Sequence, residues 1–367
     1  MTFGARALIR LGALKHNLSV IRDSAPGAKV MAVIKANAYG HGMEPVAASL
    51  EDADAFAVAR LPEAIRLHES GIDKPIVLLA GAMTQAELDD ALGRGFELVV
   101  HCPEQLEQLE SARRPGAVVW LKFDTGMNRL GFAPQEAPEL IERMRRCPAV
   151  RELRLMSHLA NADDPDDPMT REQFASFRAL AEGFDGAVSI ANTPGALGWP
   201  ELQDASERLG FRGNHWIRPG IALYGISPFA GRTGADLGLI PVMQFEARLI
   251  AVKPLQEGAR VGYKGRYRAQ RDSMLGIISA GYGDGYTRHF RTGTPVLING
   301  RRVPLIGLVS MDLIAVDLGP FASDKVGDIA TLWGKGLPVE EVAPWADAIP
   351  YELVCGVMNR EASEVVD

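Results

Sequence analysis

The stretch Val30-Met-Ala-Val-Ile-Lys35-Ala-Asn-Ala-Tyr39-Gly-His-Gly42 runs from five apolar residues into a lysine and then into a glycine-containing turn. A continuous apolar run of this length is typical of a strand that is buried on both faces, as in a parallel sheet. Lysine is almost never fully buried without a partner, so the lysine that ends this strand needs a specific explanation.

Two explanations for Lys35 follow from its position. Either the side chain reaches solvent past the end of the strand, or its desolvated amine loses its proton more readily and forms a Schiff base with an aldehyde. Gly40 and Gly42 favour the second explanation, because backbone without side chains lets an anionic ligand approach closely.

The same pattern of apolar runs recurs along the first two thirds of the chain. Seven further runs follow the lysine strand, at residues 53–59, 75–80, 96–100, 117–123, 153–159, 188–191 and 217–224. Helical patterns separate most of them, at residues 84–92, 103–113, 138–147 and 170–183, and Thr84 with Glu87 forms a capping-box pattern. Eight strand–helix units predict an α/β fold of the (β/α)8 barrel type.

In such a barrel the chemistry lies at the C-terminal ends of the strands. Several polar side chains fall at those positions: Lys35, Lys122, His158, Asn192 and Arg218. The acidic segment 163–168 lacks the glycine and the terminal glutamate of a calcium loop, so we interpret it as a solvated loop and helix start.

The helical pattern stops after Ile240. Short strand patterns divided by Gly, Pro and Asp follow, at residues 242–252, 274–279, 295–298, 313–318 and 329–332. We therefore expect a barrel domain over residues 1–235 and a C-terminal all-β domain over residues 236–367, with a glycine-rich linker at 228–238. A weakly alternating strand at 5–11 could join the β domain.

Composition excludes several classes of protein. The 367 residues carry a net charge of −7, which disfavours a nucleic-acid-binding face. The three cysteines, Cys102, Cys147 and Cys355, show neither a disulfide framework nor a zinc spacing, and the histidines show no metal motif. No segment reaches the apolar length of a membrane span, so we expect a cytoplasmic protein.

The lysine stretch also carries a specific resemblance. Ala32-Val-Ile-Lys-Ala-Asn-Ala-Tyr-Gly-His-Gly42 resembles the cofactor-lysine signature of the alanine racemases, which use pyridoxal 5'-phosphate. The resemblance implies that Lys35 carries the cofactor and that Tyr39 donates its hydroxyl to the phosphate. It extends over essentially the whole chain in seven separated segments.

A second segment, Lys122-Phe-Asp-Thr-Gly-Met-Asn-Arg-Leu-Gly131, resembles another signature of this family. The resemblance implies that Arg129 contacts the phenolic oxygen of the cofactor and orders the substrate carboxylate. Asn128 stands where family members usually have glycine. Lys122 matches a lysine that some relatives carry as a carbamate, an anion that would hold Arg129; a plain surface lysine, or one paired with a bound anion, is the alternative.

The last barrel strands supply the remaining cofactor contacts that the resemblance implies. A lone histidine at a strand end is more often structural, but the family places a histidine at the position of His158, bonded to the catalytic tyrosine and to the next arginine. Arg218 would face the pyridine nitrogen. Because guanidinium is always protonated and has no acceptor, it cannot accept a ring proton, and the pyridine stays neutral. The backbone amides of Gly220 and Ile221, together with Thr193, would hold the phosphate.

The β domain contains the second half of the implied site. Val261-Gly-Tyr263-Lys-Gly resembles the motif of the opposing catalytic tyrosine. A tyrosine in water is too weakly acidic to be an efficient base at neutral pH, and the resemblance implies that His158 and Arg218 act on it. Gly281-Tyr282-Gly-Asp-Gly-Tyr286 and Val309-Ser-Met311-Asp312 match two further signatures.

By the same resemblance, Tyr282 lines the substrate entrance, the Met311 amide grips the substrate carboxylate, and Asp312 is counted with these substrate-binding residues. The segment 351–355 matches the closing segment of the family, and we expect Cys355 to be a packed core thiol. Asn359 departs from the pattern, because some relatives have a phosphate-binding tyrosine there.

The resemblance therefore implies an alanine racemase with a two-base mechanism, in which Lys35 and Tyr263 act on opposite faces of the substrate. It also implies a homodimer in which Tyr263 and Met311 reach the site of the partner subunit. Supply of D-alanine for peptidoglycan and breakdown of alanine both remain open roles. A racemase of broader specificity that accepts serine, and a non-catalytic pyridoxal-phosphate carrier, are the alternatives; Arg218 disfavours a barrel decarboxylase.

Overall fold

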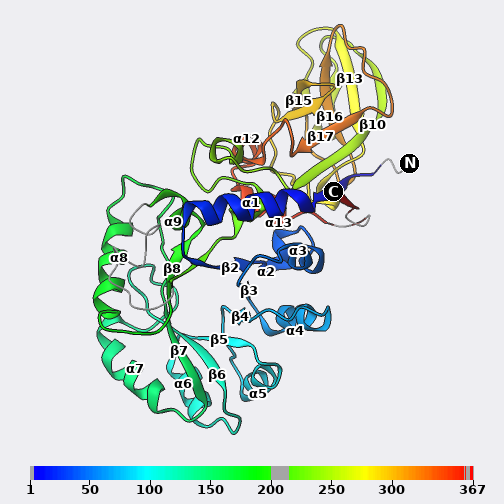
Figure 1. Ribbon diagram of the computed structural model, residues 1–367. Helices are drawn as coiled ribbons and strands as arrows, with labels where there is room; N and C mark the ends of the chain where they lie inside the picture. The colour runs from blue at the N-terminus through cyan, green and yellow to red at the C-terminus, as the bar shows by residue number, and fades with distance from the viewer. Residues whose placement is uncertain (1–3, 200–214, 359, 361–363, 367) are drawn as a thin grey trace.

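The computed structural model describes residues 4–199, 215–358, 360 and 364–366. Eight parallel strands close into a barrel, and the (β/α)8 prediction is confirmed (Figure 1). The strands are β2 (Lys29–Val33), β3 (Ala55–Val58), β4 (Ile76–Leu78), β5 (Glu97–Val100), β6 (Ala117–Lys122), β7 (Val150–Met156), β8 (Val188–Asn192) and β9 (His215–Arg218). The barrel closes where β2 pairs with β9, with Lys29 opposite Trp216 and Val30 opposite Ile217.

Helices follow most of the barrel strands and cover their outer face. They are α3 (Met43–Ser49), α4 (Leu61–Glu69), α5 (Gln85–Arg94), α6 (Pro103–Glu110), α7 (Ala137–Arg146), α8 (Met169–Leu180) and α9 (Thr193–Gly198), and α1 (Leu11–Ser24) precedes the barrel. The capping box predicted at the start of α5 is half formed. The Thr84 hydroxyl accepts from the Glu87 amide, but the Glu87 carboxylate accepts from Met83 instead of Thr84.

A buried ion pair fills part of the barrel interior. The Arg154 guanidinium on β7 donates to the Glu97 carboxylate on β5 over 2.9 Å, and it lies 5.0 Å from the centroid of the Trp120 ring. The Trp120 indole donates to the same carboxylate over 2.8 Å. Because both charges are paired and hydrogen-bonded, their burial is tolerated and the barrel interior is a packed core.

The C-terminal strands form an eight-stranded sheet in the order β13-β16-β15-β14-β17-β10-β1-β18. Its members are β1 (Arg6–Arg10), β10 (Met243–Leu255), β13 (Ser273–Ile278), β14 (Pro295–Ile298), β15 (Arg301–Ile306), β16 (Ile314–Gly319), β17 (Ile329–Trp333) and β18 (Glu364–Val366). β1 runs antiparallel to β10 and parallel to β18, so the first strand of the chain belongs to this sheet. The expected boundary between residues 235 and 236 falls before β10 and stays a prediction.

Three local predictions were wrong. The apolar run 217–224 ends as a strand at Arg218, because Pro219 and Gly220 interrupt it, and residues Ile221–Tyr224 form the 3-10 helix η2. The run 153–159 belongs to a strand that starts earlier, at Val150, and ends at Met156. β15 was missed, because its sequence Arg-Arg-Val-Pro-Leu-Ile contains a proline and two charges. The β domain also carries two short helices, α12 (Val339–Val342) and α13 (Pro350–Cys355).

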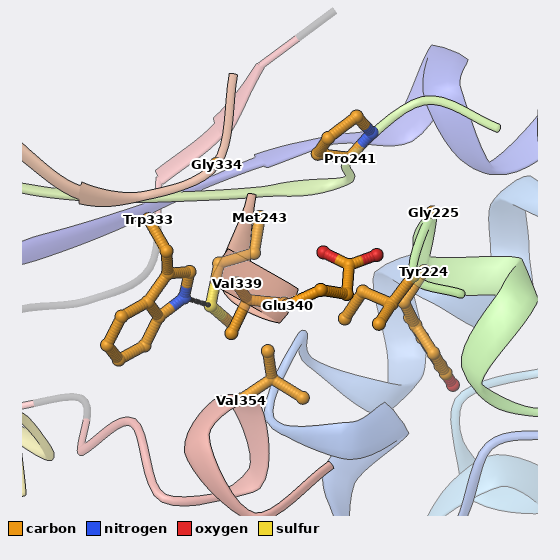
Figure 2. A pocket seen from close by; sticks show the side chains of 10 residues that line it. Tyr224, Gly225, Pro241, Met243, Trp333, Gly334, Val339, Glu340 and Val354 are labelled. Atoms are coloured by element: carbon orange, nitrogen blue, oxygen red, sulfur yellow. Dashed lines mark hydrogen bonds between the residues drawn. The ribbon is translucent and has the colours of Figure 1, made fainter. Parts of the chain in front are cut away.

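A half-buried carboxylate joins the β domain to the segment that leaves the barrel. Glu340 on α12 accepts hydrogen bonds from the backbone amides of Ser227, at 2.9 Å, and Gly234, at 2.8 Å. Glu340 also lines a small pocket, with Tyr224 of η2 on one side and Trp333 of β17 on the other (Figure 2). The linker predicted at 228–238 is therefore tied to the β domain. In the described part of the chain, no helix is long and apolar enough to cross a membrane.

We predict that Glu340→Ala lowers the free energy of unfolding by about 2–4 kcal/mol, because it leaves two buried amides without an acceptor. Urea unfolding followed by circular dichroism would measure this loss. Glu341→Ala is the matched control, because the neighbouring carboxylate only forms an exposed ion pair with Arg302 at 2.7 Å. That pair is worth at most about 1 kcal/mol. Equal losses in the two variants would show that the Glu340 contacts do not stabilise the junction.

Candidate active site

Lys35 stands directly after β2, at the start of a left-handed turn. Ala36, Asn37, Ala38 and Tyr39 have φ angles between 52° and 54°. Each L-residue in this conformation costs about 1–2 kcal/mol, so four in succession persist only where their surroundings hold them. The turn ends at Gly40, where a Cβ atom would lie 2.2 Å from the carbonyl oxygen of Val354.

Side chains from outside and inside the turn hold it in place. The Glu63 carboxylate on α4 accepts from the Ala36 amide at 2.7 Å, and the Asn37 side chain accepts from the Met43 amide at 3.1 Å. His41 donates from Nδ1 to the carbonyl oxygens of the turn, at 2.9 Å for that of Tyr39. Burial lowers the pKa of His41 to about 4, so the ring stays neutral near pH 7.

The environment of Lys35 favours its free amine. The side chain is half-buried, and this burial, followed by the positive charge of Arg129, lowers the pKa of Lys35. The Glu63 carboxylate acts in the opposite direction, with a smaller effect. A lysine with a lowered pKa has a larger fraction of unprotonated amine, which is the form that attacks an aldehyde.

Beside Lys35, hydroxyl and amide groups form a cradle with room for backbone but not for a side chain. A Cβ atom on Gly220 would lie only 2.5 Å from the Tyr39 hydroxyl oxygen. The Gly220 amide donates to the Thr193 hydroxyl at 2.9 Å. Burial raises the pKa of Tyr39, so its hydroxyl stays protonated and can donate. Among the described residues, the buried amide of Ile221 has no acceptor.

This set of donors fits a phosphate group, because phosphate oxygens accept hydrogen bonds from hydroxyls and backbone amides. The cradle belongs to the same site as Lys35, whose side-chain amine can form a Schiff base with an aldehyde. The residues present therefore match the two functional ends of pyridoxal phosphate, an aldehyde and a phosphate.

Arg218 at the end of β9 is buried and donates to several acceptors of the barrel. It donates to the Ser157 carbonyl at 2.6 Å and also to the Ser189 hydroxyl. It lies 3.1 Å from Nδ1 of His158, which must accept because guanidinium only donates. Burial lowers the pKa of Arg218 to about 9, so it remains charged at neutral pH.

His158 is neutral in this arrangement. Burial, and then the charge of Arg218, keep the pKa of His158 well below its ordinary value. Because Nδ1 accepts from Arg218, the proton of the neutral ring is on Nε2, which is left to donate. The predicted contact of His158 with the next arginine is thus present in the structure.

The loop that follows β6 presents Arg129. Asp124 shapes this loop, since its carboxylate accepts from the backbone amides of Gly126 at 3.0 Å, Asn128 at 2.9 Å and Arg129 at 2.9 Å. Asn128 has a φ of 56°, which explains why an asparagine can replace glycine here, since asparagine tolerates the left-handed conformation.

Lys122 at the end of β6 is buried next to this group of cations. Burial, followed by the charges of Arg218 and Arg129, lowers the pKa of Lys122 to about 8. Asp124 opposes this shift. Lys122 therefore carries an appreciable fraction of free amine at neutral pH, unlike an ordinary surface lysine.

The predicted residues of the β domain form a separate group. Tyr263 in η4 (Tyr263–Gly265) is 64% exposed and Met311 is 52% exposed. The amide of Tyr282 donates to Ser310 at 3.0 Å, and Asp312 accepts from Arg360 at 2.6 Å. Among the described residues, no hydrogen bond, ion pair or ring contact joins Tyr263, Tyr282, Met311 or Asp312 to the group around Lys35.

Three other residues singled out from the sequence lie outside this group or outside the described structure. Asn192 caps α9 by accepting from the Gly195 amide, so its place at a strand end serves the helix. Cys355 is exposed at the end of α13, so the prediction of a core thiol was wrong. Asn359 lies outside the described residues.

Sequence reasoning missed Glu63, Ser157 and Ser189. Of these, only Glu63 left a local signal, because it lies in the first turn of a helix pattern.

Comparison with known proteins gives consistent matches over the whole chain. Two family models match, "Alanine racemase, N-terminal domain" over residues 9–228 and "Alanine racemase, C-terminal domain" over residues 242–365. The chain is 47% identical to an alanine racemase of Vibrio atlanticus and 48% identical to one of Aeromonas hydrophila, with 99% of each chain covered. The crystal structure of the biosynthetic alanine racemase from Pseudomonas aeruginosa superposes with a TM-score of 0.92 at 40% identity, covering 100% of both chains.

Proposed function

This chain belongs to the alanine racemase family, and we propose that it racemises alanine with pyridoxal 5'-phosphate held at Lys35 and with Lys35 and Tyr263 as the two proton-transferring groups. The observation that supports this most directly is the half-buried Lys35 amine, with its lowered pKa, beside the cradle of Tyr39, Thr193 and Gly220. When bound, the cofactor supplies the electron sink that makes the α-proton of alanine acidic.

Six residues besides Lys35 would hold the cofactor. Tyr39, Thr193 and Ile221 offer donors suited to its phosphate, and the Gly220 amide would join them on leaving the Thr193 hydroxyl. Arg129, in the loop after β6, and Arg218, at the end of β9, offer charged donors. Arg218 has no acceptor atom, so it cannot take a proton from a ring nitrogen that it faces. Its bonds to Ser157 and His158 fix its orientation before any ligand arrives.

The protein's own part in the reaction is to move one proton at the α-carbon of alanine. Inversion needs one group that removes the proton from one face and a second group that returns a proton to the other. We assign these roles to Nζ of Lys35 and the hydroxyl oxygen of Tyr263. Arg129, the Met311 amide and Asp312 would order the substrate carboxylate, and Tyr282 would line the entrance.

A second copy of the chain would complete the site. Tyr263 and Met311 are exposed in a single chain, and exposed aromatic and methionine side chains are typical of surfaces that a partner covers. We propose a homodimer in which each β domain supplies Tyr263 and Met311 to the Lys35 of its partner. His158, through the free Nε2–H inferred from its contact with Arg218, would then be available to Tyr263 of the partner subunit.

We expect the purified protein loaded with pyridoxal phosphate to racemise L-alanine in deuterated water, with deuterium appearing at the α-carbon. Both proton-transferring groups exchange with solvent, so in deuterated water each inversion leaves a deuteron at the α-carbon of the product. Optical rotation and proton NMR would follow the two changes, with L-serine and L-lysine run beside alanine. Comparable rates on serine would favour the broader racemase. No exchange on any amino acid would identify a carrier and overturn the proposal.

We predict that Tyr263→Phe loses racemisation by about 10²–10⁴-fold but still exchanges the α-proton of one alanine enantiomer with solvent. Only one of the two groups is removed, and Lys35 continues to serve its own face. Cofactor absorbance should be unchanged. Loss of exchange on both enantiomers, or racemisation at the normal rate, would remove Tyr263 from this role.

Mixing Tyr263→Phe with Lys35→Ala is the control for the shared site. Random exchange of subunits makes half of the dimers hybrid, each with one complete site, so about a quarter of the activity should return. If hybrids form and no activity returns, Lys35 and Tyr263 do not meet across two subunits.

We further propose that Lys122 carries a carbamate. Its amine would attack carbon dioxide, forming an N–C bond and releasing a proton, and the resulting anion would lie among Arg129, Arg218 and Lys35. The pKa of Lys122, lowered to about 8, supports this, because only the free amine reacts.

At a fixed pressure of labelled carbon dioxide, we expect the occupancy of this carbamate to rise from pH 7 to pH 9. The free-amine fraction of Lys122 increases from roughly a tenth to roughly nine tenths over that range. The carbon-13 NMR signal of the carbamate should be absent in Lys122→Arg. An identical spectrum for the two proteins at every pH would leave a plain lysine.

A further inference from the structure

A buried glutamine outside the proposed site links the loops that carry its charged residues. Gln173 on α8 is 1% exposed, and its amide uses both the acceptor and the donor. Oε1 accepts from the Ala160 amide at 2.8 Å. Nε2 donates to the His158 carbonyl at 3.0 Å and lies 3.5 Å from the Thr125 hydroxyl.

These partners belong to two different loops. His158 and Ala160 lie in the loop after β7, which also contains Ser157, whose carbonyl accepts from Arg218. Thr125 lies in the loop after β6, whose backbone amides are gathered by Asp124 and which ends in Arg129. The hydroxyls of Thr125 and Ser157 are 2.8 Å apart, so Ser157 contacts Thr125 through its hydroxyl and Arg218 through its carbonyl.

The Arg129 loop is internally fixed, but its attachment to the β7 loop depends on few contacts. Asp124 holds three of its amides, and backbone bonds between residues 122–124 and Phe132 close its base. Among the described residues, the Phe123 amide at the base of the loop donates to the Met156 carbonyl at the end of β7 at 2.9 Å. Beyond that bond, the loop is joined to Ser157 of the β7 loop and to Gln173 of α8 through the Thr125 hydroxyl. Gln173 also fills the space beneath the loop, since a Cβ atom on Gly126 would lie 3.3 Å from its Cγ.

We propose that Gln173 is a positioning residue that sets the separation of the Arg129 loop from the loop of Ser157 and His158. This role of Gln173 rests on the proposed function, in which Arg129 orders the substrate carboxylate and His158 contacts Arg218. Losing the glutamine amide leaves partly buried backbone groups of His158 and Ala160 unpaired on the β7 loop and frees the Arg129 loop to tilt. A displacement of this kind impairs substrate binding through Arg129 without touching Lys35.

The chain contains a matched control for this role. Gln105 on α6 is likewise buried, accepts from the His101 amide at 2.9 Å and donates to the Ala80 carbonyl at 3.0 Å. It therefore joins the loops after β4 and β5 in the same way that Gln173 joins those after β6 and β7. No residue assigned to the site lies on the segments that Gln105 joins.

The experiment compares Gln173→Met with Gln105→Met in the holoenzyme, since methionine matches the length of glutamine and removes its hydrogen bonds. We expect the alanine KM of Gln173→Met to rise about tenfold, with a smaller fall in kcat, as for a modest misplacement of a binding group. Gln105→Met should change both constants less than about twofold while losing similar thermal stability. Equal kinetic effects in the two variants, or none in Gln173→Met, would overturn the proposal.

Thr125→Val is the second variant, and it carries the test if Gln173→Met does not fold. It removes the hydrogen bonds of the Thr125 hydroxyl with Ser157 and Gln173. Both bonds of Gln173 to the β7 loop remain. Amide hydrogen exchange should then accelerate at residues 126–129 and not at Ala160, together with a rise in KM. Unchanged exchange and unchanged KM would overturn the proposal. Because exchange is read without substrate, a protein that fails to act on alanine would refute the proposed function and leave this test intact.

Discussion

The left-handed turn after β2 is the constraint on which the rest of the site depends. Four consecutive residues, none of them glycine, adopt a conformation that costs about 1–2 kcal/mol each, and the turn presents Lys35 at its start and Tyr39 at its end. The cost is offset by contacts from separate parts of the chain: Glu63 of α4, the ring of Tyr224, which lies 4.4 Å from that of His41, and the backbone of α13 at Gly40. The amine and the hydroxyl are therefore fixed before a ligand binds.

A second feature of the site is its excess of positive charge. Lys35, Lys122 and Arg218 lie at the C-terminal ends of barrel strands, and Arg129 lies in the loop after β6. Burial, followed by the neighbouring positive charges, lowers the pKa values of both lysines. The nearby carboxylates also accept from backbone amides, Asp124 from those of its own loop and Glu63 from that of Ala36 in the turn after β2. Such a site favours anionic ligands, and both a phosphate and a carboxylate meet that requirement.

The two domains supply different groups to the proposed site. The barrel supplies every group assigned to the cofactor, while the groups assigned to the second face of the substrate lie exposed on the β domain. The barrel and the β domain of one chain are joined through β1, which pairs with β10, and through the Glu340 carboxylate. A fixed orientation of the β domain would be needed to present Tyr263 and Met311 to a second subunit in a constant geometry.

The sequence by itself determined the barrel and the positions of Lys35, Lys122 and His158 at or just after its strand ends, whereas the run 217–224 did not show that β9 ends at Arg218. Apolar runs mark buried parallel strands, and closure of the sheet gathers their C-terminal ends whatever the loops do. Tertiary structure alone decided the left-handed turn, whose alanines carry no local signal, and the serine partners of Arg218. Ser157 lies 61 residues from Arg218 in the chain, and Gln173 lies 48 residues from Thr125. Such contacts arise from the packing of neighbouring barrel units, and no local pattern of residues encodes them.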